Sequence, residues 1–73
     1  MTDTKLLESL IQDKGITKTF IAKQLGITKQ GLWLKIENKS QFKPSEIKEL
    51  CKILGITSLK QKERIFFAEF VDK

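Results

Sequence analysis

The sequence predicts an all-α fold, a compact domain of five helices that contains a helix-turn-helix. Three observations support this prediction. Apolar residues recur at helical spacing in five stretches, glycines close several of these stretches, and the connections between them are only a few residues long. Residues 1–73 are expected to form one domain, because the chain is short and contains no linker, repeat or low-complexity tract.

Capping residues set the bounds of the expected helices. Threonine side chains cap helix starts, proline suits a first turn, and glycine adopts the left-handed conformation that ends many helices. The helices are expected over about Thr4–Lys14, from Thr17 to Gly26, over about Lys29–Glu37, from Pro44 to Gly55 and over about Leu59–Asp72.

The most informative stretch is residues 17–38, which has the pattern helix, turn, helix. Ala22 is small enough for two helices to cross closely, Gly26 suits the turn, and Leu32 is an apolar residue that would lock the pair together. In a DNA-binding helix-turn-helix the second helix lies in the major groove. An ordinary helical hairpin is the alternative.

Positive charge is concentrated around this stretch. The segment from Lys14 to Lys43 contains seven lysines and one acid, a balance of +6, whereas the whole chain carries +5. A localised basic patch suits a polyanionic partner, because each lysine that docks on a phosphate releases condensed counterions. A solvated lysine-rich face would have the same composition.

Residues 6–57 resemble the Cro/repressor (xenobiotic-response-element) family of helix-turn-helix regulators. The tail that begins at Glu63 is also similar to the ends of small Cro-like regulators from phages of Gram-positive bacteria. The matching residues are Ile16, Thr17, Ala22, Leu25–Thr28, Gln30, Leu32, Glu37–Lys39, Pro44, Ser45, Leu50 and Leu54–Thr57.

The resemblance implies a double-stranded DNA operator as partner. Thr17 and Lys18, at the start of the second helix, would hold a phosphate. Lys29 and Gln30 would meet base edges, each good pair being worth about 1–3 kcal/mol of discrimination, and loop lysines would anchor the backbone. The residues expected to face DNA are Thr17, Lys18, Thr28, Lys29, Gln30, Trp33, Lys39 and Lys43.

Two residues depart from the family pattern inside the third helix. Gly31 costs about 0.8–1.0 kcal/mol relative to alanine there, a loss that a close approach to DNA or to the second helix would explain. Lys35 stands where the family is apolar and inward, so Ile36 is expected to take over the core contact.

Trp33 and Leu34 are the third departure. If Leu32 and Ile36 face inward, Trp33 is turned about 100° away from Leu32. An outward tryptophan could pack on DNA, form a protein-binding hot spot together with Leu34, or fold back on Phe42. All three alternatives stay open at this point.

The last helix is more apolar than one core-facing side requires. Ile65, Phe66, Phe67, Phe70 and Val71 would either all belong to the core or form a symmetric homodimer contact. Trp33, Leu34, Phe66 and Phe70 are therefore the candidates for contact with a protein partner.

Catalysis, metal binding and membrane insertion have little support. The chain has no histidine or tyrosine, and its single cysteine, Cys51, lies on an apolar helical stripe, where a thiol is most often a small hydrophobe. No cofactor, metal or small-molecule substrate is implied. Without a signal peptide or a membrane span, the chain is expected to be cytoplasmic.

These observations together predict a small phage or prophage transcriptional regulator of the Cro type. The alternative is an antirepressor that binds a phage repressor protein through the surface around Trp33. The polar start of the third helix favours the first interpretation, and its apolar middle favours the second.

Overall fold

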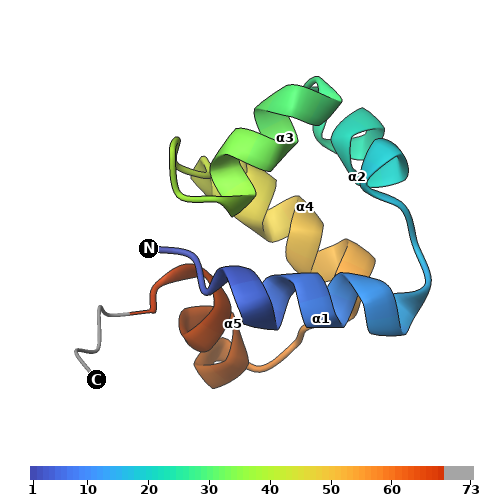
Figure 1. Ribbon diagram of the computed structural model, residues 1–73. Coiled ribbons are helices and arrows are strands. Elements are labelled where there is room, and N and C mark those ends of the chain that lie inside the picture. Colours follow the sequence, from blue (N-terminus) through green and yellow to red (C-terminus); the bar gives the residue numbers. More distant parts are fainter. Residues whose placement is uncertain (69–73) are drawn as a thin grey trace.

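The computed structural model describes residues 1–68 and contains five α-helices, with no strand in that range. The all-α prediction is therefore confirmed. None of these helices is long and apolar enough to cross a membrane. The helices are α1 (Thr4–Lys14), α2 (Lys18–Leu25), α3 (Lys29–Ile36), α4 (Pro44–Leu54) and α5 (Leu59–Phe66), shown in Figure 1.

The helix starts follow local capping chemistry. At four of the five starts, a side-chain oxygen accepts a hydrogen bond from a backbone N–H of the first turn, which otherwise has no partner. The residues that cap in this way are Asp3, Thr17, Thr28 and Ser58. Gly26 ends α2 at φ 73°, in the left-handed region, and so allows the sharp turn into α3.

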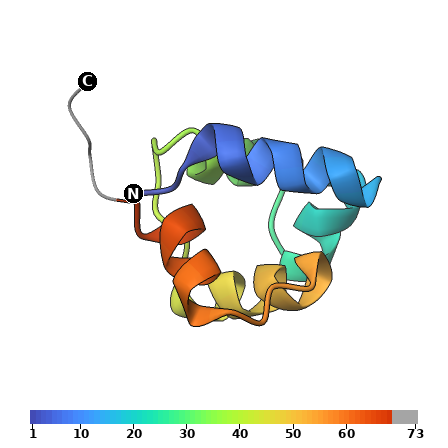
Figure 2. The ribbon, with the colours of Figure 1, turned by 90° about the horizontal axis from the view of Figure 1, so that it is seen from below.

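One apolar core joins all five helices. In Figure 1, α3 lies at the top of the molecule, α1 and α5 lie at the bottom, and α4 runs between them. Figure 2 shows α1 and α5 side by side, consistent with their contacts. The most deeply buried residues come from every helix: Leu7, Ile21, Leu32, Ile36, Leu50 and Ile65.

The last helix is shorter than the sequence predicted. It ends at Phe66 rather than near Asp72, and Phe67 has left helical geometry at φ −125°. Phe66 is only 4% exposed and its ring packs edge-on against Phe42, with 5.7 Å between the ring centres. The prediction that Phe66 faces a protein partner is therefore wrong, because the core takes up this ring. Phe70 lies outside the described residues.

The N-terminal segment ties α3 to α5. The amide group of Asn38, just beyond α3, donates to the carbonyl of Thr2 and accepts from its N–H, both at 2.8 Å. The backbone N–H of Asp3 donates to the carbonyl of Ile65 at 2.7 Å. Thr2 is buried as a result. The start of the chain thus connects the C-terminal ends of two helices that are far apart in sequence.

Candidate nucleic-acid interface

Packing between α2 and α3 decides which residues reach the surface. Ala22 and Leu32 are buried where the two helices meet, and Ile36 is fully buried one turn further along α3. With this side of α3 in the core, Lys29 and Gln30 are exposed at its N-terminus. The expected outward placement of both residues is confirmed, whereas their contact with DNA remains a prediction.

The start of α3 is held by Thr28. Its side-chain oxygen accepts from the N–H of Gly31 at 2.9 Å, so this threonine acts first as a cap. A β-carbon at residue 31 would lie 3.1 Å from the same oxygen and 3.9 Å from the side chain of Ile27. These neighbours belong to the turn that precedes α3. Contact with α2 therefore does not explain the glycine, and close approach to DNA stays a prediction.

The start of α2 differs from the expectation at Lys18. Thr17 caps the helix through a 3.0 Å hydrogen bond from the N–H of Phe20. The ammonium group of Lys18, however, donates to the carboxylate of Glu8 on α1 at 2.8 Å, and both side chains are about a third exposed. A partly exposed pair of this kind is weak. Glu8 therefore competes with a phosphate for the Lys18 ammonium group and offsets part of its charge.

The loop that carries Lys39 and Lys43 folds back on α3. Asn38 adopts φ 65°, a left-handed conformation that asparagine tolerates better than most residues. The backbone N–H groups of Lys39 and Ser40 then both donate to the carbonyl of Leu34, at 2.8 and 3.2 Å. Lys39 and Lys43 are exposed, as expected for residues that would hold a phosphate backbone.

Lys35 makes a contact that sequence reasoning missed. Its ammonium group donates to the Glu46 carboxylate at 2.8 Å and to the carbonyl of Gln41 at 3.2 Å. The same Glu46 oxygen accepts from the backbone N–H of Lys43 at 2.8 Å. The Lys35 and Glu46 side chains are only 12% and 8% exposed. Ile36 takes the core contact as predicted, but Lys35 also points inward and joins α3 to α4.

The ionisation of Glu46 reflects opposing effects. Burial alone would raise the pKa of its carboxyl group, because a low-dielectric site disfavours the charged form. The hydrogen bonds from Lys35 and the Lys43 backbone outweigh that effect, and the pKa is lowered from its ordinary value. Glu46 is therefore an ionised carboxylate at neutral pH, held close to the loop lysines.

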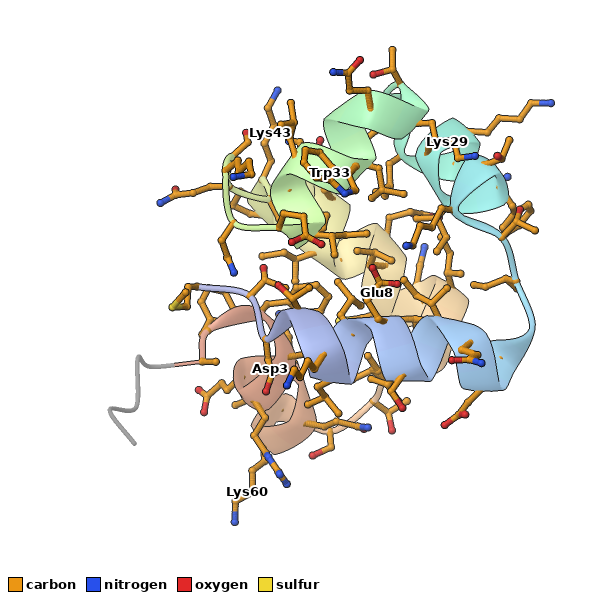
Figure 3. The ribbon with its side chains drawn as sticks, in the orientation of Figure 1. Asp3, Glu8, Lys29, Trp33, Lys43 and Lys60 are labelled. Atoms are coloured by element: carbon orange, nitrogen blue, oxygen red, sulfur yellow. The ribbon has the colours of Figure 1, made fainter. Side chains whose placement is uncertain are left out.

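These ion pairs reduce the positive charge available to a partner. Of the seven lysines between residues 14 and 43, Lys18 and Lys35 are paired with carboxylates. The others are Lys14, Lys23, Lys29, Lys39 and Lys43. Figure 3 shows Lys29 on α3 and Lys43 at the loop beyond it, on the part of the surface that α3 presents.

Comparison with family models matches residues 6–60 to the Cro/C1-type HTH DNA-binding domain. The match covers more than half of the chain. The chain belongs to this family. Comparison with curated proteins and with solved structures gives no match. The family resemblance read from the sequence is thus confirmed, and DNA is the partner that a domain of this family indicates.

Trp33 has a distinct place in this Cro/C1-type domain. Its side chain is 45% exposed on α3, and Leu34 beside it is half-buried. Figure 3 shows Trp33 on the α3 ribbon. Phe42 packs on Phe66, and Trp33 remains accessible, so the interpretation in which Trp33 folds back over Phe42 is not supported. DNA and a protein partner remain as the two candidates for contact with this indole.

Cys51 is the one cysteine of the Cro/C1-type domain, and it is half-buried on α4. Burial raises the pKa of its thiol, although the nearby Lys62 opposes the shift. A thiol with a raised pKa is a poor nucleophile at neutral pH. Within residues 1–68, no group of three metal-binding side chains comes together.

Three residues that shape this interface were given no role from the sequence: Glu8, Asn38 and Glu46. Each acts through a partner that is remote in the chain, which helical periodicity does not reveal. One signal was available for Glu46. A lysine at an inward position of α3 needs a carboxylate nearby, and the first turn of the next helix contains one.

Proposed function

We propose that this protein is a transcriptional regulator that binds operator DNA by placing α3 in the major groove. The observation that carries this proposal is the polar start of α3, where Lys29 and Gln30 are exposed above the buried Leu32. Lysine can donate to guanine O6 and N7, and glutamine can bond adenine through two hydrogen bonds. These two residues would therefore read sequence.

The remaining contacts would position the domain without reading bases. The N-terminus of α2 carries the partial positive charge of a helix start, which suits a phosphate beside Thr17. Lys39 and Lys43 would hold the backbone on the other side of α3. Lys18 would join them once DNA competes successfully with Glu8.

The finer function we propose is that of a small phage or prophage regulator of the Cro type, acting in the cytoplasm. It would work by occupancy, because a bound domain denies the operator to polymerase or to a competing repressor. A homodimer would place two copies of α3 on half-sites about 34 Å apart. The family match and the localised charge support DNA binding, and the similarity of the tail supports the phage setting.

Two variants separate base reading from backbone contact. We expect Gln30→Ala to lose discrimination between operator and random duplex, and Lys39→Ala to weaken both alike while reducing the salt slope by about one unit. The measurement is a binding titration of each variant on both duplexes over a salt series. Equal losses on both duplexes for Gln30→Ala would rule out base reading by this residue.

A second function is favoured by the 45% exposure of Trp33 next to Leu34. DNA-reading helices are mostly polar at such positions, whereas exposed tryptophan is typical of protein-binding hot spots. The alternative is therefore an antirepressor that binds a phage repressor through this surface. Trp33→Ala should then abolish binding to a phage repressor in a pull-down assay. If the DNA-binding proposal holds, repressor capture does not depend on Trp33.

A further inference from the structure

A groove between α4 and α5 lies at the opposite end of the molecule from α3. Cys51, Ile56 and Leu59 form its apolar floor, and Lys48, Lys52 and Lys62 surround them. We call this the α4/α5 groove. Figure 1 shows α3 at the top and the α4–α5 connection at the bottom, and no residue of α3 lines the groove.

Leu59 is the accessible part of the apolar floor, because Ile56 is buried and Cys51 is half-buried. Leu59 is 68% exposed, the most exposed of the large apolar residues in the described chain. A second hollow continues from Leu59 and Lys62 to Phe67, which is 54% exposed. The α4/α5 groove is open to solvent and has a volume of about 430 Å³, enough for one or two side chains of a partner.

The three lysines around the groove form no ion pair within residues 1–68, and Glu63 is the one acid that lines the adjoining hollow. The two ion pairs in that range use Lys18 and Lys35. Lys48, Lys52 and Lys62 belong to neither pair, and the ammonium group of Lys14 lies beside Gly55 at the end of the groove. An apolar floor with cations on its edges complements a segment with the reverse pattern.

We propose that the α4/α5 groove binds a protein segment in which apolar side chains are flanked by carboxylates. Such a segment would cover Leu59 with its apolar residues and place its acids beside Lys52 and Lys62. A nucleic-acid phosphate would use only the lysines and would leave Leu59 in water, which is why we assign the groove to an acidic peptide. Because this surface is separate from α3, the regulator could hold DNA and this partner together.

The probe that tests this proposal is a short blocked peptide of leucine, phenylalanine and glutamate. Two control peptides carry lysine in place of glutamate, or serine in place of the apolar residues. Backbone amide shifts of the isotope-labelled full chain report where each peptide binds. We expect the acidic apolar peptide alone to give saturable shifts at Cys51, Ile56, Leu59 and Lys62.

Matched variants test the two halves of the groove. Lys52→Glu combined with Lys62→Glu should weaken peptide binding at least about tenfold, and Leu59→Ser should have a similar effect. The control is Lys5→Glu combined with Lys60→Glu, which makes the same change in net charge at exposed lysines that do not line the groove. Figure 3 shows Lys60 pointing away from the body of the molecule. This control should bind the peptide almost as well as the unaltered chain.

Several results would overturn the proposal. If the serine peptide binds equally well, charge attraction alone explains the binding. If the shifted amides lie on α3, the peptide does not bind in the groove. A short duplex that shifts the same groove amides would identify the surface as nucleic-acid binding. If Leu59→Ser instead converts a dimer into a monomer in sedimentation, the groove is a contact between two copies. DNA binding by the groove variants should match that of the control, so a failure here leaves the DNA-binding proposal standing.

Discussion

At the scale of single residues, a carboxylate of the protein already binds one of the lysines at the N-terminus of α2. Lys18 was expected to hold a phosphate, but the structure pairs it with Glu8 at 2.8 Å. Spacing along the sequence does not predict this contact. The two residues lie on different helices, and the angle between those helices decides whether the side chains meet. The pair places one negative charge close to the surface that would meet DNA. Removing that charge should therefore change binding in a defined direction.

We expect Glu8→Gln to strengthen binding to any duplex by about 1.5- to 5-fold, which corresponds to the roughly 0.2–1 kcal/mol held by an exposed ion pair. The released Lys18 should add about 0.9 to the slope of log affinity against log salt. Titrations of operator and random duplexes over a salt series measure both effects. Glu63→Gln on α5 is the control, because it makes the same charge change away from α2. Equal gains for both variants would contradict a specific role for Glu8.

At the scale of helices, the α3–α4 junction depends on Lys35 and Glu46. Nearly buried ion pairs contribute modestly while intact, but removing one partner leaves the other charge unpaired away from water. Here Glu46 also accepts a hydrogen bond from the backbone N–H of Lys43, and Lys35 donates one to the carbonyl of Gln41. The pair therefore shapes the loop between the two helices. We therefore regard it as the contact that positions Lys43 relative to α3, whereas Lys39 is held by its bond to the Leu34 carbonyl.

Breaking this pair should destabilise the fold. We expect Glu46→Gln to lower the free energy of unfolding by about 3 kcal/mol, because Lys35 is left with a neutral partner. Lys35→Met should cost a similar amount. The double variant should lose clearly less than the two single losses added together, since neither charge is then stranded. Urea denaturation of the four proteins measures the coupling, and strict additivity would contradict a functional pair.

The same pair predicts a pH dependence. The pKa of Glu46 is lowered from its ordinary value of 4.5 in the folded chain, so the unfolded chain takes up a proton first as the pH falls. The contribution of Glu46 is therefore fully present above about pH 4.5 and is lost as the pH falls through the lowered pKa. The stability difference between the unaltered chain and Glu46→Gln should shrink over that window. A difference that stays constant down to low pH would show that Glu46 is not the titrating group.

Helix placement was the part of the structure that sequence predicted best. Thr17, Thr28, Gly26 and Pro44 act through their own or neighbouring backbone groups, so their effects can be read locally. The end of α5 could not be read in this way. Its aromatic residues fit a longer helix, but Phe66 packs on Phe42 and Phe67 leaves the helix. The same limit applies to the interface, where outward positions were predictable and long-range ion pairs were not.

At the scale of the whole molecule, the start of the chain joins α3 to α5. The side chain of Asn38 binds the N–H and the carbonyl of Thr2. The backbone N–H of Asp3 donates to the carbonyl of Ile65 near the end of α5. In addition, the hydroxyl of Thr4 donates to the carbonyl of Ile36 at 2.6 Å. The C-terminal end of α3 is thus held by the opposite end of the sequence. A small core gains from such links, because it buries little apolar surface per residue.

Two substitutions at Asn38 should separate its two roles. Asn38→Gly keeps the left-handed backbone accessible but loses the hydrogen bonds to Thr2, at an expected cost of about 1–2 kcal/mol. Asn38→Ala loses the same bonds and adds about 1 kcal/mol of backbone strain. Urea denaturation ranks the variants, and hydrogen exchange at the Asp3 amide should quicken in both. If Asn38→Gly is as stable as the unaltered chain, the link to Thr2 does not contribute.

Trp33 is the single tryptophan of the chain, and its indole lies half in water on α3. The protein therefore carries an intrinsic fluorophore on the helix proposed to enter the groove of DNA. A duplex that covers the indole should change its emission without any added dye. A peptide seated between α4 and α5 is expected to leave the emission nearly unchanged, because Trp33 does not line that groove. Tryptophan fluorescence of the unlabelled chain, titrated with duplex or with peptide, thus distinguishes occupancy of the two surfaces.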